Sequence, residues 1–105
     1  MDDKQLIPLR ESIEHWNRLA DGDENESIGP LSCALRREFY IGRTVETACI
    51  GCPVHAKTGK KYCAGSPYSD CEDAVKMDGN GKDVFDADFR AKALLQLQFL
   101  ESLLP

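Results

Sequence analysis

Residues 49–63, with the sequence CIGCPVHAKTGKKYC, contain three of the five cysteines in this chain of 105 residues. Together with Cys33 they form the pattern Cys33-x15-Cys49-x2-Cys52-x10-Cys63. A C-x2-C pair presents two sulfurs to one ion, and two further thiolates complete the tetrahedral coordination of a structural zinc site. The sequence therefore predicts one zinc ion bound by Cys33, Cys49, Cys52 and Cys63.

Four protein ligands would close this metal site. A zinc ion without an open coordination position contributes folding energy and does not activate water or substrate. Two alternatives use the same cysteines, namely an iron-sulfur cluster and a redox-active pair. The redox alternative is disfavoured because no buried strand precedes Cys49, as a thioredoxin-like C-x-x-C motif requires. With no spacing typical of a catalytic set, the pattern favours a protein that is not an enzyme.

Two further residues are candidate substitute ligands. His55 follows Cys52 by three positions and could replace one sulfur, although a surface histidine near the site is the simpler interpretation. Cys71 could lie near the metal as a fifth thiol, although a small buried packing residue is again simpler.

Size and composition place limits on the class of protein. A chain of 105 residues supports one domain with a thin core, which a metal site would stabilise. The terminal sequence MDDKQLIPLR lacks the basic and apolar regions of a signal peptide, and no stretch approaches the roughly 20 apolar residues that span a bilayer. We therefore expect a cytoplasmic protein with no membrane partner, in which disulfides are uncommon.

The net charge of −5 is unevenly distributed. Residues 1–32 carry three basic and eight acidic side chains, residues 33–63 carry six and two, and residues 64–105 carry four and eight. The basic centre is a possible phosphate-binding patch, but it also offsets the negative charge of four thiolates on one zinc ion. Because acidic flanks repel a polyanion, nucleic-acid binding is the less favoured alternative.

Helical patterns dominate the rest of the chain, so we expect a mainly α single domain. It comprises a helical N-terminal part (1–32), a zinc knuckle (33–71) and a long C-terminal helix (84–104). The first predicted helix runs from Leu9, after Pro8, to Ala20 with Trp16 in the core, and the second from Pro30 to Gly42. A short helix follows from Pro53 to Gly59 with Cys52 as its cap, and another from Ser69 to Val75 with a Ser69–Glu72 capping box. After a turn at DGNGKD, the last helix runs from Val84 to Leu104 with Asp83 as its cap and Leu95 on its apolar face.

The segments CIGCPV, TGKKYC, GSPY and FLESLLP, with Cys33-Ala34-Leu35 before them, resemble a family. The chain is similar to small cysteine-rich proteins of unknown function from bacteriophage and prophage genomes. The resemblance implies a genomic setting and no known activity. It also implies that Arg36 stands where relatives often have a second cysteine, which is a further reason to consider His55 and Cys71 as ligands.

These observations predict a phage-type accessory protein in the cytoplasm of a bacterial host. It would act through protein-protein interaction with a host or phage protein, and the sequence indicates no particular oligomeric state. The alternatives are an iron-sulfur or redox protein and a nucleic-acid-binding protein.

Overall fold

The computed structural model describes residues 1–23, 26, 34–40, 42–44, 46–60 and 66–105. This part of the chain forms a small, mainly helical domain, as the sequence predicts. Its elements, in chain order, are α1 (Asp3–Ala20), α2 (Ala34–Phe39), α3 (Pro53–Thr58), α4 (Tyr68–Ala74), β1 (Lys76–Met77), β2 (Asp83–Val84) and α5 (Ala87–Glu101). Among the helices described, none is long and apolar enough to cross a membrane.

Helix α1 begins at Asp3, so the predicted start at Leu9 is wrong. Asp2 is the N-cap: its side chain accepts a hydrogen bond of 3.1 Å from the Gln5 backbone N–H, and the Gln5 side chain accepts one of 3.4 Å from the Asp2 N–H. This capping box stabilises the first turn. Pro8 lies inside the helix and is buried, so it continues the helix although it cannot donate a backbone hydrogen bond.

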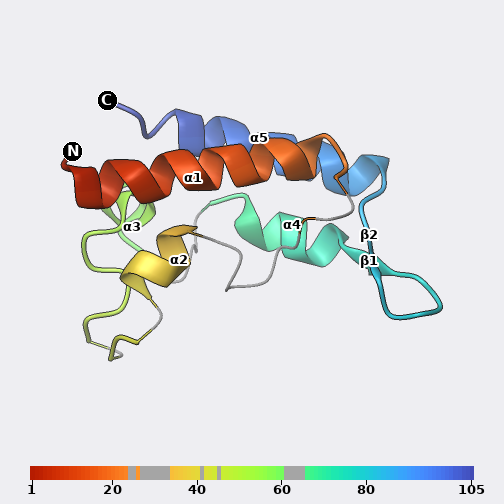
Figure 1. Ribbon diagram of the computed structural model, residues 1–105, viewed down its shortest axis with the longest axis horizontal. Coiled ribbons are helices and arrows are strands. Elements are labelled where there is room, and N and C mark those ends of the chain that lie inside the picture. Colours follow the sequence, from red (N-terminus) through yellow and green to blue (C-terminus); the bar gives the residue numbers. More distant parts are fainter. Residues whose placement is uncertain (24–25, 27–33, 41, 45, 61–65) are drawn as a thin grey trace.

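Helices α1 and α5 lie side by side and antiparallel, which places both ends of the chain at the same end of the domain (Figure 1). The core lies along their facing sides, where Trp16 is 1% exposed and Phe89 is fully buried. Other members of this core are Leu9, Leu19, Ala93, Leu97 and Leu100. The prediction that Trp16 is a core residue is confirmed.

Helix α5 begins at Ala87, so the predicted start at Val84 with Asp83 as the cap is wrong. Asp86 is the N-cap, and its Oδ1 atom accepts a hydrogen bond of 2.9 Å from the Phe89 N–H. The physical reason for the later start is that Asp83 and Val84 form strand β2, whose extended backbone cannot belong to the helix.

The outer face of α5 is also apolar. Leu94 is 46% exposed and Leu95 is 51% exposed, so Leu95 does not widen the buried face as predicted. Leu104 is 38% exposed, because the helix ends at Glu101 and no longer directs this side chain toward the core. Leu94 and Leu95 therefore give α5 apolar side chains on its outer side as well as on its buried side.

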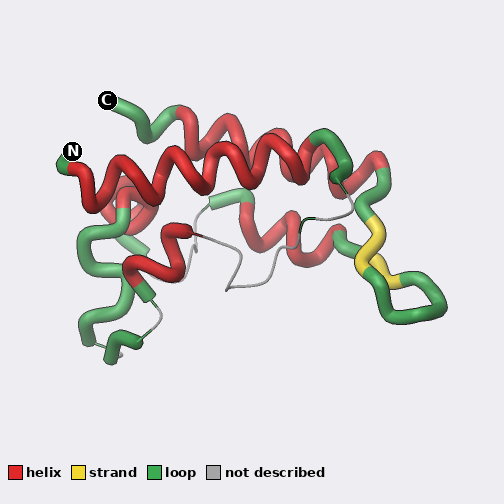
Figure 2. Tube along the Cα trace, viewed as in Figure 1, coloured by secondary structure: helices red, strands yellow, loops and turns green. Residues whose placement is uncertain are grey.

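Strands β1 and β2 pair antiparallel in a short hairpin that projects beyond the helices (Figure 2). The predicted turn at DGNGKD is confirmed: the Asp78 Oδ1 atom accepts hydrogen bonds from the N–H groups of Asn80 (2.8 Å) and Lys82 (3.0 Å). The strands themselves were not predicted, because two residues are too few to show an alternating pattern.

Helix α4 packs against α5 and contributes an aromatic side chain to the core. The helix begins at Tyr68 with Pro67 as its N-cap, so the predicted capping box of Ser69 and Glu72 is wrong. Because Pro67 starts the helix earlier, Ser69 already lies within its first turn. The Tyr68 ring meets the Trp16 ring edge-on, with 5.9 Å between the centroids.

Helix α2 packs against α1 and leads toward the cysteine-rich segment. It ends at Phe39, before the predicted end at Gly42, and the predicted start at Pro30 lies outside the described residues. The Leu35 N–H donates a hydrogen bond of 3.3 Å to the buried Ser12 hydroxyl. This contact supplies an acceptor to one of the N–H groups that a helix start leaves unsatisfied.

Candidate metal centre

The segment from Cys49 to Cys52 forms a tight turn directly before α3. The Cys52 N–H donates a hydrogen bond of 3.1 Å to the Cys49 carbonyl, and the Cys49 N–H donates one of 2.6 Å to the carbonyl of Phe39 at the end of α2. Both Cys49 (φ 66°) and Gly51 (φ 89°) have left-handed backbone conformations. The turn joins α2 to α3, and the positive φ angles of Cys49 and Gly51 determine its shape. We call it the CIGC turn.

Helix α3 begins and ends as the sequence predicts. Cys52 is its N-cap and Pro53 its first residue, where a missing N–H has no cost. Gly59 follows the last residue with φ 71°, and its N–H donates a hydrogen bond of 2.8 Å to the His55 carbonyl. Only glycine adopts this conformation easily, which is why the sequence locates the end of the helix so well.

The two cysteines of the CIGC turn are both buried. Cys49 is 8% exposed and Cys52 is 7% exposed, and Cys52 packs within the core together with Val54. Two sulfurs on one short turn, shielded from bulk water, are what a C-x2-C pair needs to ligate a structural metal.

A pair of threonines fixes the chain that leads into the CIGC turn. The Thr44 N–H donates a hydrogen bond of 3.0 Å to Thr47 Oγ1, and the Thr47 N–H donates one of 3.3 Å to Thr44 Oγ1. The Ala48 N–H bonds the Thr44 carbonyl at 2.9 Å, and the Ile50 N–H bonds the Thr47 carbonyl at 3.3 Å. This network defines the path of the backbone without using either sulfur.

The other two predicted ligands, Cys33 and Cys63, lie outside the described residues. Within the part of the chain that is described, no group of three or more His, Cys, Asp or Glu side chains is arranged to hold a metal ion. The described residues present Cys49 and Cys52 together on one turn, and they do not show a zinc knuckle.

His55 lies on α3, and its ring is oriented by a backbone group. Its Nδ1 atom donates a hydrogen bond of 3.0 Å to the Lys60 carbonyl. Because a carbonyl can only accept, Nδ1 carries a proton and Nε2 is the nitrogen with which a neutral His55 ring would coordinate an ion. Ligating histidines are commonly oriented in this way, so His55 stays a candidate substitute ligand.

Cys71 lies on α4 and is fully buried in the core. Burial, with added repulsion from Asp70, raises the pKa of the Cys71 thiol to about 12. At neutral pH the side chain is therefore a neutral thiol in apolar surroundings, whereas a zinc ligand is a thiolate. The environment of Cys71 favours packing over coordination.

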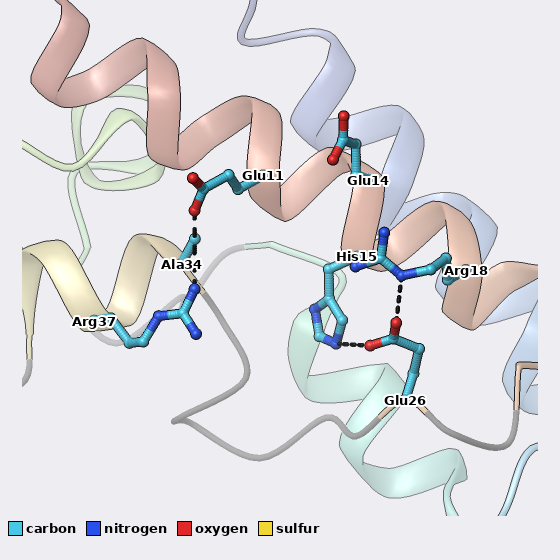
Figure 3. Close-up of a pocket in the computed structure, with 7 residues that line it drawn as sticks. All are labelled: Glu11, Glu14, His15, Arg18, Glu26, Ala34 and Arg37. Atoms are coloured by element: carbon cyan, nitrogen blue, oxygen red, sulfur yellow. Dashed lines mark hydrogen bonds and ion pairs between the residues drawn. The ribbon is translucent and has the colours of Figure 1, made fainter.

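A polar pocket that the sequence does not predict lies between α1 and α2 (Figure 3). The Glu26 carboxylate pairs with His15 Nε2 at 3.4 Å and with Arg18 Nε, and Arg37 Nη2 lies 3.8 Å from Glu11 Oε2. The pocket has a volume of about 420 Å³ and is lined by Glu11, Glu14, His15, Arg18, Glu26, Ala34 and Arg37. These pairs hold α1 to its neighbours and are structural contacts.

One signal in the sequence points toward this pocket. His15 and Arg18 lie three positions apart on α1, where a helix places two side chains on one face. That spacing indicates a shared acidic partner, but several acidic side chains follow α1, and the spacing cannot select Glu26 among them.

Comparison with known proteins identifies no relative of this chain. No family model matches it, and neither a curated protein nor a solved structure does. The likeness to phage proteins is therefore an expectation from the quoted motifs alone, and function has to be argued from the geometry of the CIGC turn.

Proposed function

We propose that this protein is a non-enzymatic module in which Cys33, Cys49, Cys52 and Cys63 coordinate one structural zinc ion. The observation that carries the proposal is the backbone of Cys49, with its φ of 66°. This conformation costs a residue with a Cβ atom about 1 kcal/mol or more, and glycine or asparagine adopts it more readily. Backbone preference does not favour cysteine in this conformation. A buried cysteine at this position therefore indicates that its sulfur has a function, which we propose is to bind the metal ion.

Zinc is the preferred metal because a closed site stabilises a domain with a thin core. The described part of the chain buries its apolar side chains chiefly between α1, α4 and α5, whereas α3 is only six residues long. A six-residue helix is marginal without external contacts. A metal ion bound at its N-cap, Cys52, would supply such a contact.

The iron-sulfur alternative uses the same four thiolates and would be visible as colour. If the site binds zinc and not a cluster, protein purified without oxygen should be colourless and contain zinc. Thermal unfolding before and after treatment with a chelator should then show a large loss of stability that added zinc restores. A melting temperature that the chelator does not change would contradict the proposal.

The proposed role is interaction with a host or phage protein in the bacterial cytoplasm. This role is supported by the outer face of α5, where Leu94 and Leu95 are both about half exposed. Leu94 also lines an open groove of about 390 Å³ between α1 and α5, together with Ala91 and Arg90. Apolar side chains gathered on one helix face are typical of a contact surface.

Affinity capture from a bacterial lysate tests this part of the proposal. Leu94→Asp and Leu95→Asp should each abolish capture of a stoichiometric partner, because a charge in an apolar contact is costly. Asn80→Asp is the control, since it adds the same charge at an exposed polar position in the turn of the β1–β2 hairpin, outside α5. Capture that all three variants retain, or the absence of a stoichiometric partner, would contradict an interaction through this face.

A further inference from the structure

Arg43 contacts the CIGC turn from outside. Its Nη1 atom donates a hydrogen bond of 3.1 Å to the Ile50 carbonyl and a longer one of 3.5 Å to the Thr47 carbonyl. Its Nη2 atom donates one of 3.2 Å to the Glu38 carbonyl at the end of α2. One planar guanidinium therefore joins the last turn of α2 to the turn that carries both cysteines.

The same guanidinium lies over the ring of Phe39, with 5.5 Å from its central carbon to the ring centroid. Phe39 is itself in contact with the CIGC turn. Its carbonyl accepts the Cys49 N–H, and its Cε1 atom lies 3.3 Å from the point where a Cβ atom on Gly51 would be. Arg43 thus holds the turn both directly, through Ile50, and indirectly, through Phe39.

The charge of Arg43 also suits a site made of thiolates. Four thiolates around a divalent ion leave about two net negative charges, which a permanent cation nearby offsets. The Ile50 carbonyl is directed at this guanidinium. Its partial negative charge is therefore engaged by Arg43.

We propose that Arg43 is the positioning residue of the metal centre. It builds the CIGC turn in the metal-free protein, so that Cys49 and Cys52 are already placed when the ion arrives. The role in metal binding rests on the proposed zinc site, whereas the role in building the turn does not.

The test measures two properties of three variants. Arg43→Met keeps most of the aliphatic stem and removes the charge and the donors. Arg43→Lys keeps the charge and removes the planar fork. Arg37→Met is the matched control on α2, where the arginine pairs with Glu11 on α1.

The first property is the rate of amide hydrogen exchange in chelator-treated protein. Arg43→Met should make the Cys49 and Cys52 amides exchange about tenfold faster, because the Ile50 carbonyl of the turn loses its charged donor and the flanking Thr47 and Glu38 carbonyls lose theirs. Exchange at Ala93 and Leu97 in α5 should not change, which shows that the core stays folded. A Cys49 amide that exchanges as in the wild type would overturn the proposal.

The second property is zinc affinity, measured by competition with a coloured chelator. Arg43→Met should bind zinc about 10- to 100-fold more weakly, as expected when a residue that orients ligands is lost. Arg43→Lys should fall between Arg43→Met and the wild type, and Arg37→Met should equal the wild type. Equal affinities throughout would overturn the role of Arg43 in metal binding. Wild-type protein that binds no zinc would instead overturn the zinc site itself, and the exchange rates would still decide whether Arg43 builds the turn.

Discussion

The Gln5 side chain donates a hydrogen bond of 2.9 Å from Nε2 to the carbonyl of Gly51, 46 residues further along the chain. Gln5 is also the third residue of α1, and its side-chain oxygen completes the capping box with Asp2. One amide side chain therefore joins the first turn of α1 to the CIGC turn. With Arg43 on the Ile50 carbonyl, it gives the two central carbonyls of the turn partners from outside.

Replacement of Gln5 by alanine should weaken both structures at once. Gln5→Ala removes an acceptor for the Asp2 N–H and a donor to Gly51, so we expect a loss of about 1 kcal/mol of unfolding free energy in urea. Lys4→Ala is the control, because Lys4 is exposed in the same helical turn. Equal urea midpoints for the two variants would show that the Gly51 contact is not stabilising.

The glycines offer a graded test of the geometry of the turn. Gly51→Ala should cost about 1–2 kcal/mol, because its φ of 89° is strained for alanine and the new Cβ atom would lie 3.3 Å from the Phe39 ring. Gly59→Ala has the positive φ but open space, so its cost should be smaller. Gly79→Ala has neither problem and should be nearly neutral. Chemical denaturation gives the order, and a Gly79 variant as unstable as the Gly51 variant would contradict it.

The two cysteines of the turn should respond differently to substitution. In metal-free protein, Cys49→Gly relieves a left-handed conformation and should cost less stability than Cys52→Ala, since Cys52 has an ordinary φ of −68°. With zinc present, both variants should lose the stabilisation that the ion gives the wild type. Melting temperatures with and without zinc test this. If zinc still raises the melting temperature of one of these variants, the cysteine replaced in that variant is not a zinc ligand.

The pH dependence of stability should report on Cys71. Its pKa is raised from the model-compound value of 9.0 to about 12 in the folded protein, chiefly by burial. Between these values the unfolded chain loses the proton and the folded chain keeps it, so stability should fall as the pH rises from about 9 toward 12. Cys71→Ala should be less stable at pH 8, because it leaves a cavity in the core, but should show a shallower decline above pH 9. Parallel curves for the two proteins would contradict the burial of a neutral thiol.

The predictions from sequence succeed where a boundary depends on local backbone chemistry. Pro53 and Gly59 delimit α3 correctly, because proline suits the first position of a helix and glycine suits the left-handed position after it. The start of α1 is wrong because Pro8 was interpreted as a start, whereas Asp2 and Gln5 form a stronger one. The start of α5 is wrong because Asp83 and Asp86 are both good caps, and pairing with β1 removes the first from the helix.

For the candidate metal centre too, the sequence predicts what depends on local spacing and does not predict contacts between distant parts of the chain. The C-x2-C spacing identifies Cys49 and Cys52, and the structure places both, buried, on one turn. Arg43 belongs to the basic centre (residues 33–63) that the sequence predicts to offset the thiolate charge. The hydrogen bonds of Gln5 and Arg43 to the turn were not predicted, because their acceptors are backbone carbonyls, which no sequence pattern reveals. The three-dimensional path of the chain has to be known before such partners can be named.

X-ray absorption at the zinc K-edge tests the central claim most directly, because it counts the atoms bound to the metal. Protein expressed in a bacterial cytoplasm and purified without added metal should contain one zinc ion per chain, surrounded by four sulfur atoms at about 2.3 Å. Cys52→Ser should lose this signal or replace one sulfur with a lighter atom. Zinc-free protein with reduced thiols, or a zinc ion bound mainly by nitrogen and oxygen, would contradict the account.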